Sequence, residues 1–286
     1  MSIGAADRAV PVTSGLPPAK PWLAFVIALI SAPVAFLYVG RLRHAILLFL
    51  LPFVVLSLAG WTGAVFSARG FFLMLALVLG IFLVSLFWPF LIARRRKVGL
   101  RTAVYHRIWI YLLSYVVFTA TTWFVMQHRA QLFGWEPFRV PSGSMLHTIE
   151  VGEFILADAR SGRSPTIGDL LIYAHGAENP APFIKRIVGL PRDRIAFRDC
   201  KVIRNGVALS EPYVLIDSED ASPDAQRMCN FAELTLGQDE IFLLGDNRLH
   251  SADSRAYGPS RLSDIKARAR FIWFSRDLHR VGQRLD

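Results

Sequence analysis

Four long apolar runs without a single Asp, Glu, Lys or Arg constrain this fold more than any other feature. They occupy residues 22–39, 45–66, 71–93 and 108–127. A helix needs about 20 apolar residues to cross the hydrocarbon core of a bilayer, and each run reaches or nearly reaches that length. Pro33 and Pro52 lie inside the first two runs, where membrane helices tolerate proline because neighbouring groups satisfy the freed backbone. The sequence therefore predicts four transmembrane helices within residues 22–127.

Two other interpretations of these runs are weaker. A short apolar run can be a buried core helix, but four runs separated by basic clusters are not typical of a soluble protein. The first run is not typical of a cleaved signal peptide either, because further spans follow it. Residues 1–21 are rich in Pro, Ser and Gly, and we expect them to form a disordered tail.

The net charge of +10 would by itself suggest a nucleic-acid-binding protein, but its distribution argues against that class. Residues 1–127 contain eleven Lys and Arg against one acid, Asp7, whereas residues 128–286 contain 21 basic and 21 acidic residues. The positive excess therefore belongs to the loops between the apolar runs. Such charges set membrane orientation, and no nucleic-acid partner is expected.

Loop charges predict which side of the membrane each part occupies. Eight basic residues lie in the loops after the first and third runs: Arg41, Arg43, Arg94, Arg95, Arg96, Lys97, Arg101 and Arg107. The opposite side of a four-span arrangement holds three: Arg8, Lys20 and Arg69. The positive-inside rule then places the first group in the cytoplasm. Both termini, and residues 128–286 with them, are predicted to lie outside.

The second half of the chain has the pattern of a mostly β domain. Short apolar or alternating runs at 154–157, 170–173, 184–189 and 241–245 are bounded by turn residues and predict strands. Asn205-Gly206, inside 200–209, is typical of a tight β-hairpin. A polar, acid-rich segment around 217–230 interrupts the pattern. The aromatic segment 132–138 fits either a lipid-interface contact or an ordinary core strand.

The two cysteines, Cys200 and Cys229, both belong to the predicted outside half. An oxidising compartment favours a disulfide between them, which would close the intervening loop. Two unpaired thiols are the alternative, since sequence does not reveal geometry.

One serine and one distant lysine indicate the chemistry. A serine hydroxyl is a poor nucleophile until a base removes its proton. Lysine acts as that base only where burial lowers its pKa, because desolvation disfavours the ammonium form. Lys185 lies among the apolar residues of F-I-K-R-I-V-G, and Ser144 lies in V-P-S-G-S-M. The sequence predicts that the two side chains act together.

Three clusters in the second half resemble, in order, the motifs of type I signal peptidase (leader peptidase). They are P-S-G-S-M-L-H-T-I-E-V-G-E at 141–153, K-R-I-V-G-L-P-R-D at 185–193 and G-D-N-R-L-H-S-A-D-S-R-A-Y-G at 245–258. Each cluster alone is weakly specific, but all three in order behind a membrane region are strongly specific. The resemblance covers residues 135–275, about half of the chain.

The resemblance implies roles for particular residues. Ser144 is the nucleophile and Lys185 the general base, while Ser142 contributes its hydroxyl to the oxyanion hole and Ser251 orients the lysine amine. Three further residues are implied to support the site: Met145 beside the nucleophile, and Asp253 with Arg255 as an ion pair at its floor. A purely structural role for that ion pair is the favoured alternative. The sequence departs from the family pattern at His147, where proline is usual, at Arg192, where glycine is common, and at Leu249 and His250.

The implied activity is that of a membrane-bound serine endopeptidase that cleaves signal peptides from exported preproteins after small residues in the Ala-x-Ala pattern. It implies no metal and no organic cofactor. Signal peptides and the lipid bilayer are the implied partners, and the secretion translocon is a candidate. The implied location is the bacterial plasma membrane, multi-pass, with the catalytic domain on the periplasmic face.

Several rival functions remain. A Ser–His–Asp triad could use His250 or His175 with Asp246 or Asp253. A metal hydrolase is disfavoured because no His/Glu pair has helical ligand spacing. Among Ser–Lys enzymes, a self-cleaving repressor would need a DNA-binding head where the apolar runs lie, whereas a specialised maturation peptidase stays open as the alternative. The non-enzymatic rival is a membrane scaffold with a degenerate peptidase-like domain.

Overall fold

The computed structural model describes residues 19–95, 107–161, 164–175, 179–216, 223–224 and 228–285. Most of the predicted tail at 1–21, and most of the polar segment at 217–230, lies outside these residues. The chain forms two compact units, one of residues 1–58 with 72–128 and one of residues 59–71 with 129–286. We call them the helical unit and the β unit.

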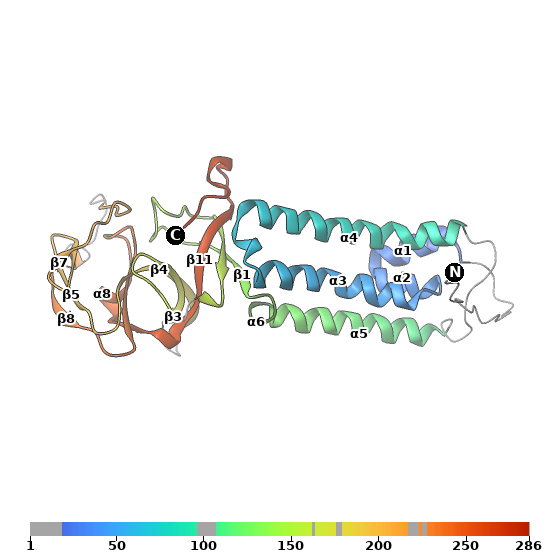
Figure 1. Cartoon of the computed structure of the whole chain (residues 1–286), viewed down its shortest axis with the longest axis horizontal. Helices are drawn as coiled ribbons and strands as arrows, with labels where there is room; N and C mark the ends of the chain where they lie inside the picture. The colour runs from blue at the N-terminus through green and yellow to red at the C-terminus, as the bar shows by residue number, and fades with distance from the viewer. Residues whose placement is uncertain are drawn as a thin grey trace, which may run out of the picture. The chain divides into compact units, whose positions relative to one another are not determined.

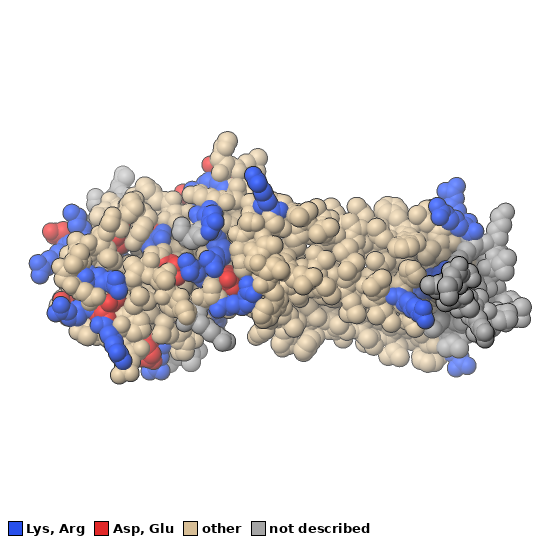
Figure 2. Space-filling model, in the orientation of Figure 1, with Lys and Arg blue, Asp and Glu red and all other residues tan. Residues whose placement is uncertain are grey.

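Apolar helices make up the helical unit. Their bounds are α1 Pro21–Ile30, α2 Ala32–Tyr38, α3 Leu42–Trp61, α4 Ala68–Arg95 and α5 Ile108–Gln127. Of the helices that the structure describes, three are long and apolar enough to cross a membrane: α3, α4 and α5. On the face shown in Figure 2, charged side chains of this unit gather at one end, and the rest of its surface on that face is uncharged.

The first apolar run is not the single transmembrane helix that the sequence predicts. It is divided at Ser31, whose backbone is extended (φ −157°, ψ 106°), into α1 and α2. Pro33, at the start of α2, supplies the reason: it has no N–H to donate, and its ring would collide with the carbonyl of Leu29 in a continuous helix. Pro52, by contrast, lies within the unbroken helix α3.

Two antiparallel sheets form the β unit (Figure 1). The larger has the order β1-β2-β11-β3-β4-β9-β10 and the smaller β7-β6-β5-β8. The strands of the larger sheet are β1 Trp135–Arg139, β2 Phe154–Asp158, β3 Leu170–His175, β4 Asn179–Gly189, β9 Glu240–Leu244, β10 Ser260–Arg261 and β11 Ile265–Phe274. Those of the smaller are β5 Arg194–Arg198, β6 Lys201–Arg204, β7 Val207–Ala208 and β8 Phe231–Thr235. Short helices complete the unit: α6 Arg129–Phe133, α8 Ser254–Tyr257 and the 3-10 turns Ala64–Phe66, Leu262–Asp264 and Leu278–Arg280.

The predicted strands at 154–157, 170–173, 184–189 and 241–245 are confirmed, as is the hairpin around Asn205 and Gly206. Those two residues have φ values of 53° and 82°, and they join β6 to β7. The aromatic segment at 132–138 forms the end of α6 and most of β1, with Phe133 buried. β1 lies at the edge of the larger sheet and its own residues are half-buried or exposed, so contact of this segment with the lipid interface stays a prediction.

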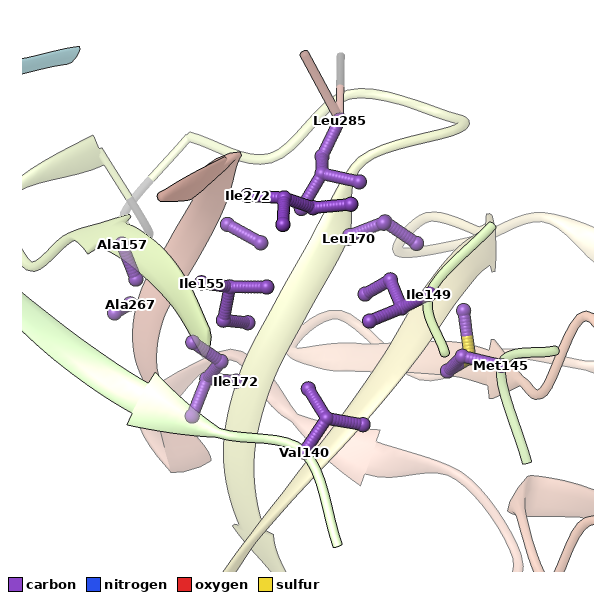
Figure 3. Close-up of a cluster of buried hydrophobic side chains, with 11 residues drawn as sticks. Val140, Met145, Ile149, Ile155, Ala157, Leu170, Ile172, Ala267, Ile272 and Leu285 are labelled. Carbon is purple, nitrogen blue, oxygen red and sulfur yellow. The ribbon is translucent and has the colours of Figure 1, made fainter. Parts of the chain in front are cut away.

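Buried side chains cover both faces of the larger sheet, and strand β3 shows this because its side chains point alternately to one face and the other. Leu170 and Ile172 point into one cluster of buried side chains, drawn in Figure 3, whereas Leu171 and Tyr173 point into another on the opposite face. Successive strand residues face opposite sides, so a strand buried on both faces is apolar throughout. The first cluster consists of Val140, Met145, Ile149, Ile155, Ala157, Leu170, Ile172, Ala267, Ala269, Ile272 and Leu285.

The connection between α3 and α4 belongs to the β unit, which the sequence did not predict. Arg160 donates to the carbonyl oxygens of Gly60, at 2.7 Å, and Trp61, at 3.3 Å. The ring of Phe71 lies 5.8 Å from that of Phe271. Residues 59–71 are thus part of the hydrogen-bonded and aromatic framework of this unit.

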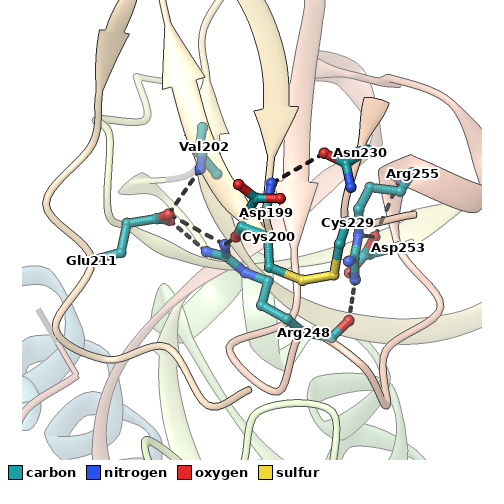
Figure 4. The surroundings of a disulfide bond; sticks show 9 residues. All are labelled: Asp199, Cys200, Val202, Glu211, Cys229, Asn230, Arg248, Asp253 and Arg255. Carbon is teal, nitrogen blue, oxygen red and sulfur yellow. Dashed lines mark hydrogen bonds and ion pairs between the residues drawn. A yellow bond between two sulfur atoms is a disulfide. The ribbon is translucent and has the colours of Figure 1, made fainter. Parts of the chain in front are cut away.

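The structure joins Cys200 and Cys229 as a disulfide between the turn after β5 and the segment before β8 (Figure 4). Beside it, the fully buried Arg248 donates to the carbonyl oxygen of Cys200 at 2.9 Å and pairs with Glu211 at 2.5 Å. Arg255 in turn donates to the carbonyl oxygen of Arg248 at 2.6 Å. The disulfide turn is therefore linked by hydrogen bonds to the loop that follows β9.

Removing the disulfide should destabilise the β unit. For the Cys200→Ala/Cys229→Ala variant we expect the free energy of unfolding to fall by about 2–4 kcal/mol, because the cross-link no longer restricts the unfolded chain. Urea unfolding followed by tryptophan fluorescence measures the change. A reducing agent should lower the stability of the parent and leave the double variant unaffected; equal stability of the two proteins in oxidising buffer would contradict the prediction.

Candidate active site

Ser144 is held in a tight turn that follows β1. The turn is closed at its base, where Gly152 N–H donates to the carbonyl oxygen of Val140 at 2.8 Å. Met145, the next residue, is fully buried in the core cluster of Figure 3 and anchors the turn beside Ser144. From the loop after β9, Asn247 donates its backbone N–H to the carbonyl oxygen of Ser144 at 3.1 Å. The serine is thus positioned by its own turn and by a second loop.

Lys185 reaches Ser144 from strand β4. Its Nζ lies 2.7 Å from Ser144 Oγ, and the two residues are only 3% and 7% exposed. Burial lowers the pKa of the Lys185 amine to about 8, against the opposing effect of the Asp253 and Asp246 carboxylates. The neutral amine is therefore populated at a far lower pH than for a solvated lysine, and it can accept a proton from the serine hydroxyl.

The next residue on β4, Arg186, ties the lysine strand to the loop after β9, and the sequence analysis missed it. Its guanidinium donates to both carboxylate oxygens of Asp246, at 2.9 and 2.7 Å, and lies 3.8 Å from the ring of Tyr213. Thr148 also donates to Asp246, at 2.5 Å. The signal available in the sequence was the adjacency of Lys185 and Arg186, together with an acidic residue in the third cluster.

The loop after β9 brings the other predicted residues to the floor of the site. Asp253 and Arg255 form an ion pair of 2.9 Å whose side chains are each 1% exposed. Asp253 also accepts a hydrogen bond from the backbone N–H of Gly245 at 3.0 Å. Ser251 Oγ is buried and has no hydrogen-bond partner among the residues described. It lies next to Gly245, where an added Cβ would come within 2.2 Å of that hydroxyl oxygen.

An apolar cavity of about 270 Å³ opens beside the serine and the lysine. Ser142 lies on its wall together with Ser144 and Lys185. The other lining residues are Phe138, Arg139, Val140, Pro141, Ile155, Ile172, Pro182, Phe183 and Ile184. Ser142 is exposed and is thus available to a bound molecule. Within the described part of the chain, the backbone N–H of Ser144 donates to no protein acceptor, so this donor is also available.

The histidines of the rival triad have a different environment. His250 is exposed, and its backbone N–H donates to the carbonyl oxygen of Asn247 at 3.2 Å. The side chain of His175 lies outside the part that the structure describes. The partner of Ser144 Oγ in the structure is the lysine amine.

Two departures from the family pattern have backbone explanations. Arg192 has φ 70°, in the left-handed region that glycine adopts without strain. His147 has φ 79°, which proline, fixed near −65°, does not adopt. The turn that carries Ser144 therefore has a conformation incompatible with the usual proline.

A serine hydroxyl beside a buried lysine amine, at the edge of an apolar cavity, is the arrangement expected of a serine peptidase whose base is lysine. The family model described as "Signal peptidase, peptidase S26" matches residues 109–274. Signal peptidase I of Bacillus caldolyticus is 31% identical over 161 residues, which cover 53% of this chain and 88% of that protein. The chain therefore belongs to the S26 signal peptidase family.

Two further proteins are similar to part of this chain. Thylakoidal processing peptidase 1 of Arabidopsis thaliana is 31% identical over 169 residues, covering 55% of this chain but only 46% of that protein. The crystal structure of a signal peptidase I from Enterococcus faecalis V583 is 28% identical, with a TM-score of 0.31, and covers 36% of this chain and 95% of that one.

Gly245 should be intolerant of any side chain. In Gly245→Ala the new Cβ would meet Ser251 Oγ at 2.2 Å and the carbonyl oxygen of Ser144 at 2.6 Å, so the nucleophile must move. We expect kcat to fall by about 10²-fold, the effect of a misplacement near 1 Å. Gly237→Ala is the matched control, because its Cβ would meet only the flexible side chain of Glu240, at 3.2 Å. Equal turnover by both variants, each shown to be folded, would contradict this account.

The depressed pKa of Lys185 predicts how activity and stability depend on pH. Only the neutral amine acts as a base, so kcat/KM should rise about tenfold per pH unit below a pKa near 8 and level off above it. The unfolded lysine keeps its ordinary pKa of 10.5 and binds more protons between pH 8 and 10.5, so the parent gains stability as the pH rises through that interval.

Lys185→Met should remove both effects. We expect an inactive protein that is at least as stable as the parent at pH 7, since no amine is desolvated on folding. Cleavage rates and thermal unfolding measured across the pH range test this. A parent pH profile that rises with an apparent pKa near that of histidine would point to another base.

Proposed function

We propose that this chain is a membrane-bound signal peptidase that cuts exported preproteins with Ser144 as nucleophile and Lys185 as general base. The observation that carries the assignment of these two residues is their 2.7 Å contact in a site sheltered from water. Membership of the S26 family supplies the reaction class. Burial makes the lysine a competent base at moderately alkaline pH.

The reaction follows from the atoms in contact. As Ser144 Oγ attacks the scissile carbonyl carbon, its proton passes to Lys185 Nζ, and the ammonium so formed later gives that proton to the leaving amine. The signal peptide then remains attached to Ser144 as an ester. Water attacks the ester after losing a proton to Lys185, and the same proton returns to Ser144 Oγ when the carbon–oxygen bond breaks.

Two donors are available for the negative charge that develops on the carbonyl oxygen. We assign this role to the Ser142 hydroxyl and the Ser144 backbone N–H. Fixed donors of this kind stabilise the transition state more than the substrate.

Ser251 is assigned to orient the lysine amine, since its buried hydroxyl needs a partner. Met145 packs beside the nucleophile, and the Asp253–Arg255 pair supports the floor of the site.

Substrate choice is assigned to the cavity beside Ser144. A volume of about 270 Å³ with a largely apolar lining suits small side chains at −1 and −3, which point to the same side of an extended peptide, and this supports cleavage after Ala-x-Ala sequences. A specialised maturation peptidase of the same clan would share this chemistry and differ in its substrates. A non-catalytic scaffold has no need of a desolvated lysine, which costs folding free energy.

In the membrane we assign α3, α4 and α5 as crossing helices. The basic ends of α4 and α5 would then face the cytoplasm, and the β unit the periplasmic side. Exported preproteins become accessible on that side, where the translocon is a candidate partner.

Preprotein cleavage by purified variants tests the proposal. A preprotein with Ala at −1 and −3 should be cut after the −1 residue, and one with Leu at −1 should not. Ser144→Ala and Lys185→Arg should be inactive, because arginine does not give up its proton. Ser142→Ala should lose about 10²–10³-fold in kcat, and His250→Ala should keep the parental rate. Active Lys185→Arg together with inactive His250→Ala would establish the triad instead.

A further inference from the structure

The first apolar run folds back on itself within the helical unit. The backbone N–H of Lys20, just before α1, donates to the Tyr38 hydroxyl, at the end of α2, at 3.0 Å. In one continuous helix these residues would be separated by roughly 27 Å, at about 1.5 Å per residue. Ser31 lies between the two helices with an extended backbone. The two ends of the run therefore lie side by side, with the turn at Ser31 remote from both.

The length of the two helices allows them to reach only part of the way through a bilayer. With 10 and 7 residues, α1 and α2 are about 15 and 10 Å long, whereas the hydrocarbon core is about 30 Å thick. A helix that crossed the membrane would need roughly 20 residues. This hairpin therefore ends near the middle of the membrane.

The contacts of α1 and α2 with α4 also place the turn of the hairpin near the middle of the membrane. Ala28 and Ala35, which flank the turn, cluster with Leu86 of α4, and the ring of Phe25 lies 5.6 Å from that of Phe87. Nearer the ends of the hairpin, the buried cluster includes Ala93 of α4. Leu86 precedes Arg95, the last residue of α4, by nine residues, or about 14 Å. These contacts lie along the basic end of α4, as Figure 1 also shows for α1 and α2.

Backbone groups at the half-buried turn make hydrogen bonds within the hairpin, as an irregular segment at membrane depth requires. The N–H of Ser31 donates to the carbonyl oxygen of Ile27 at 2.7 Å, and the N–H of Ala35 donates to that of Ser31 at 3.1 Å. Ala35 is fully buried. At the other end, Gly40 has φ 74° and turns the chain directly from α2 into α3.

We infer that residues 21–38 form a re-entrant hairpin that enters and leaves the membrane on the side of Arg41, so the N-terminus lies opposite the β unit. The inference rests on the membrane assignment of α3, α4 and α5 proposed above. It also improves the charge distribution: Arg8 and Lys20 join the eight basic residues of the cytoplasmic side, leaving Arg69 alone on the other. A ten-to-one bias obeys the positive-inside rule better than eight to three.

Cysteine labelling distinguishes the hairpin from a fourth crossing. Lys20→Cys, Leu42→Cys and Leu278→Cys each place a thiol at an exposed position, and a membrane-impermeant maleimide is applied to spheroplasts before and after permeabilisation. We expect Leu278→Cys to react at once, and Lys20→Cys and Leu42→Cys only after permeabilisation. The parent chain gives the background from its own cysteines. Reaction of Lys20→Cys together with Leu278→Cys in intact spheroplasts would show a crossing and overturn the hairpin.

Two further measurements test the hairpin in other ways. The first labels a variant at the turn, and the second uses the chain without substitutions. Ala32→Cys, at the turn, should be protected from the reagent on both sides and react only in detergent; reaction after simple permeabilisation would place the run on the membrane surface instead. An N-terminal epitope tag on the otherwise unchanged chain should resist external protease. If Leu278→Cys is protected while Lys20→Cys reacts, the orientation proposed above is wrong, but the hairpin stands.

Discussion

The contact between the Lys185 amine and the Ser144 hydroxyl depends on the exclusion of water, and the β unit is organised around this requirement. A charged lysine is disfavoured there by burial, which brings its pKa to about 8. The same burial opposes folding, since an amine leaves water without a full counter-charge beside it. The two carboxylates that oppose the shift, Asp253 and Asp246, are each neutralised by an arginine, Arg255 and Arg186. These two ion pairs reduce the electrostatic attraction of the carboxylates for the Lys185 ammonium. They also hold the surrounding loops in place.

The polar network around the site holds the strand that carries Lys185 and the turn that carries Ser144 together. Asp246 is bonded to the strand that carries the lysine, through Arg186, and to the turn that carries the serine, through Thr148. Asn247 bonds the serine turn directly. One loop thus sets the relative positions of Ser144 and Lys185, whose segments are far apart in sequence. A pair of residues 41 positions apart is brought to hydrogen-bond distance by this third element.

Much of this could be predicted from the sequence, because the signals concerned are local. Alternating apolar runs predicted the central strands, and Asn205-Gly206 predicted the hairpin turn. The apolar setting of Lys185 predicted its burial. Other features depend on long-range contacts that leave no local pattern. The closeness of Gly245 to Ser144 and Ser251 is one, and the packing of residues 59–71 on the β unit is another.

The first apolar run shows a different kind of limit. Its length and composition fit a transmembrane helix, and hydrophobicity alone does not distinguish a crossing from a hairpin. The decisive signal was Pro33, two residues after Ser31. It was interpreted as tolerable in a membrane helix, as Pro52 is. The run with Pro33 differs from the helix with Pro52 in that its small residues Ala28 and Ala35 pack against α4. Only the folded chain reveals this packing.

The strand order of the larger sheet has a consequence for synthesis of the protein. β11, which follows β2, β3 and β4 along the chain, lies between β2 and β3, so the halves of the site carried by the serine turn and by the lysine strand are joined across it. A nascent chain that lacks residues 265–274 cannot complete the sheet, and non-local pairing of this kind is intrinsically slow. The two halves of the site are therefore held in one continuous sheet only after residues 265–274 have been translated.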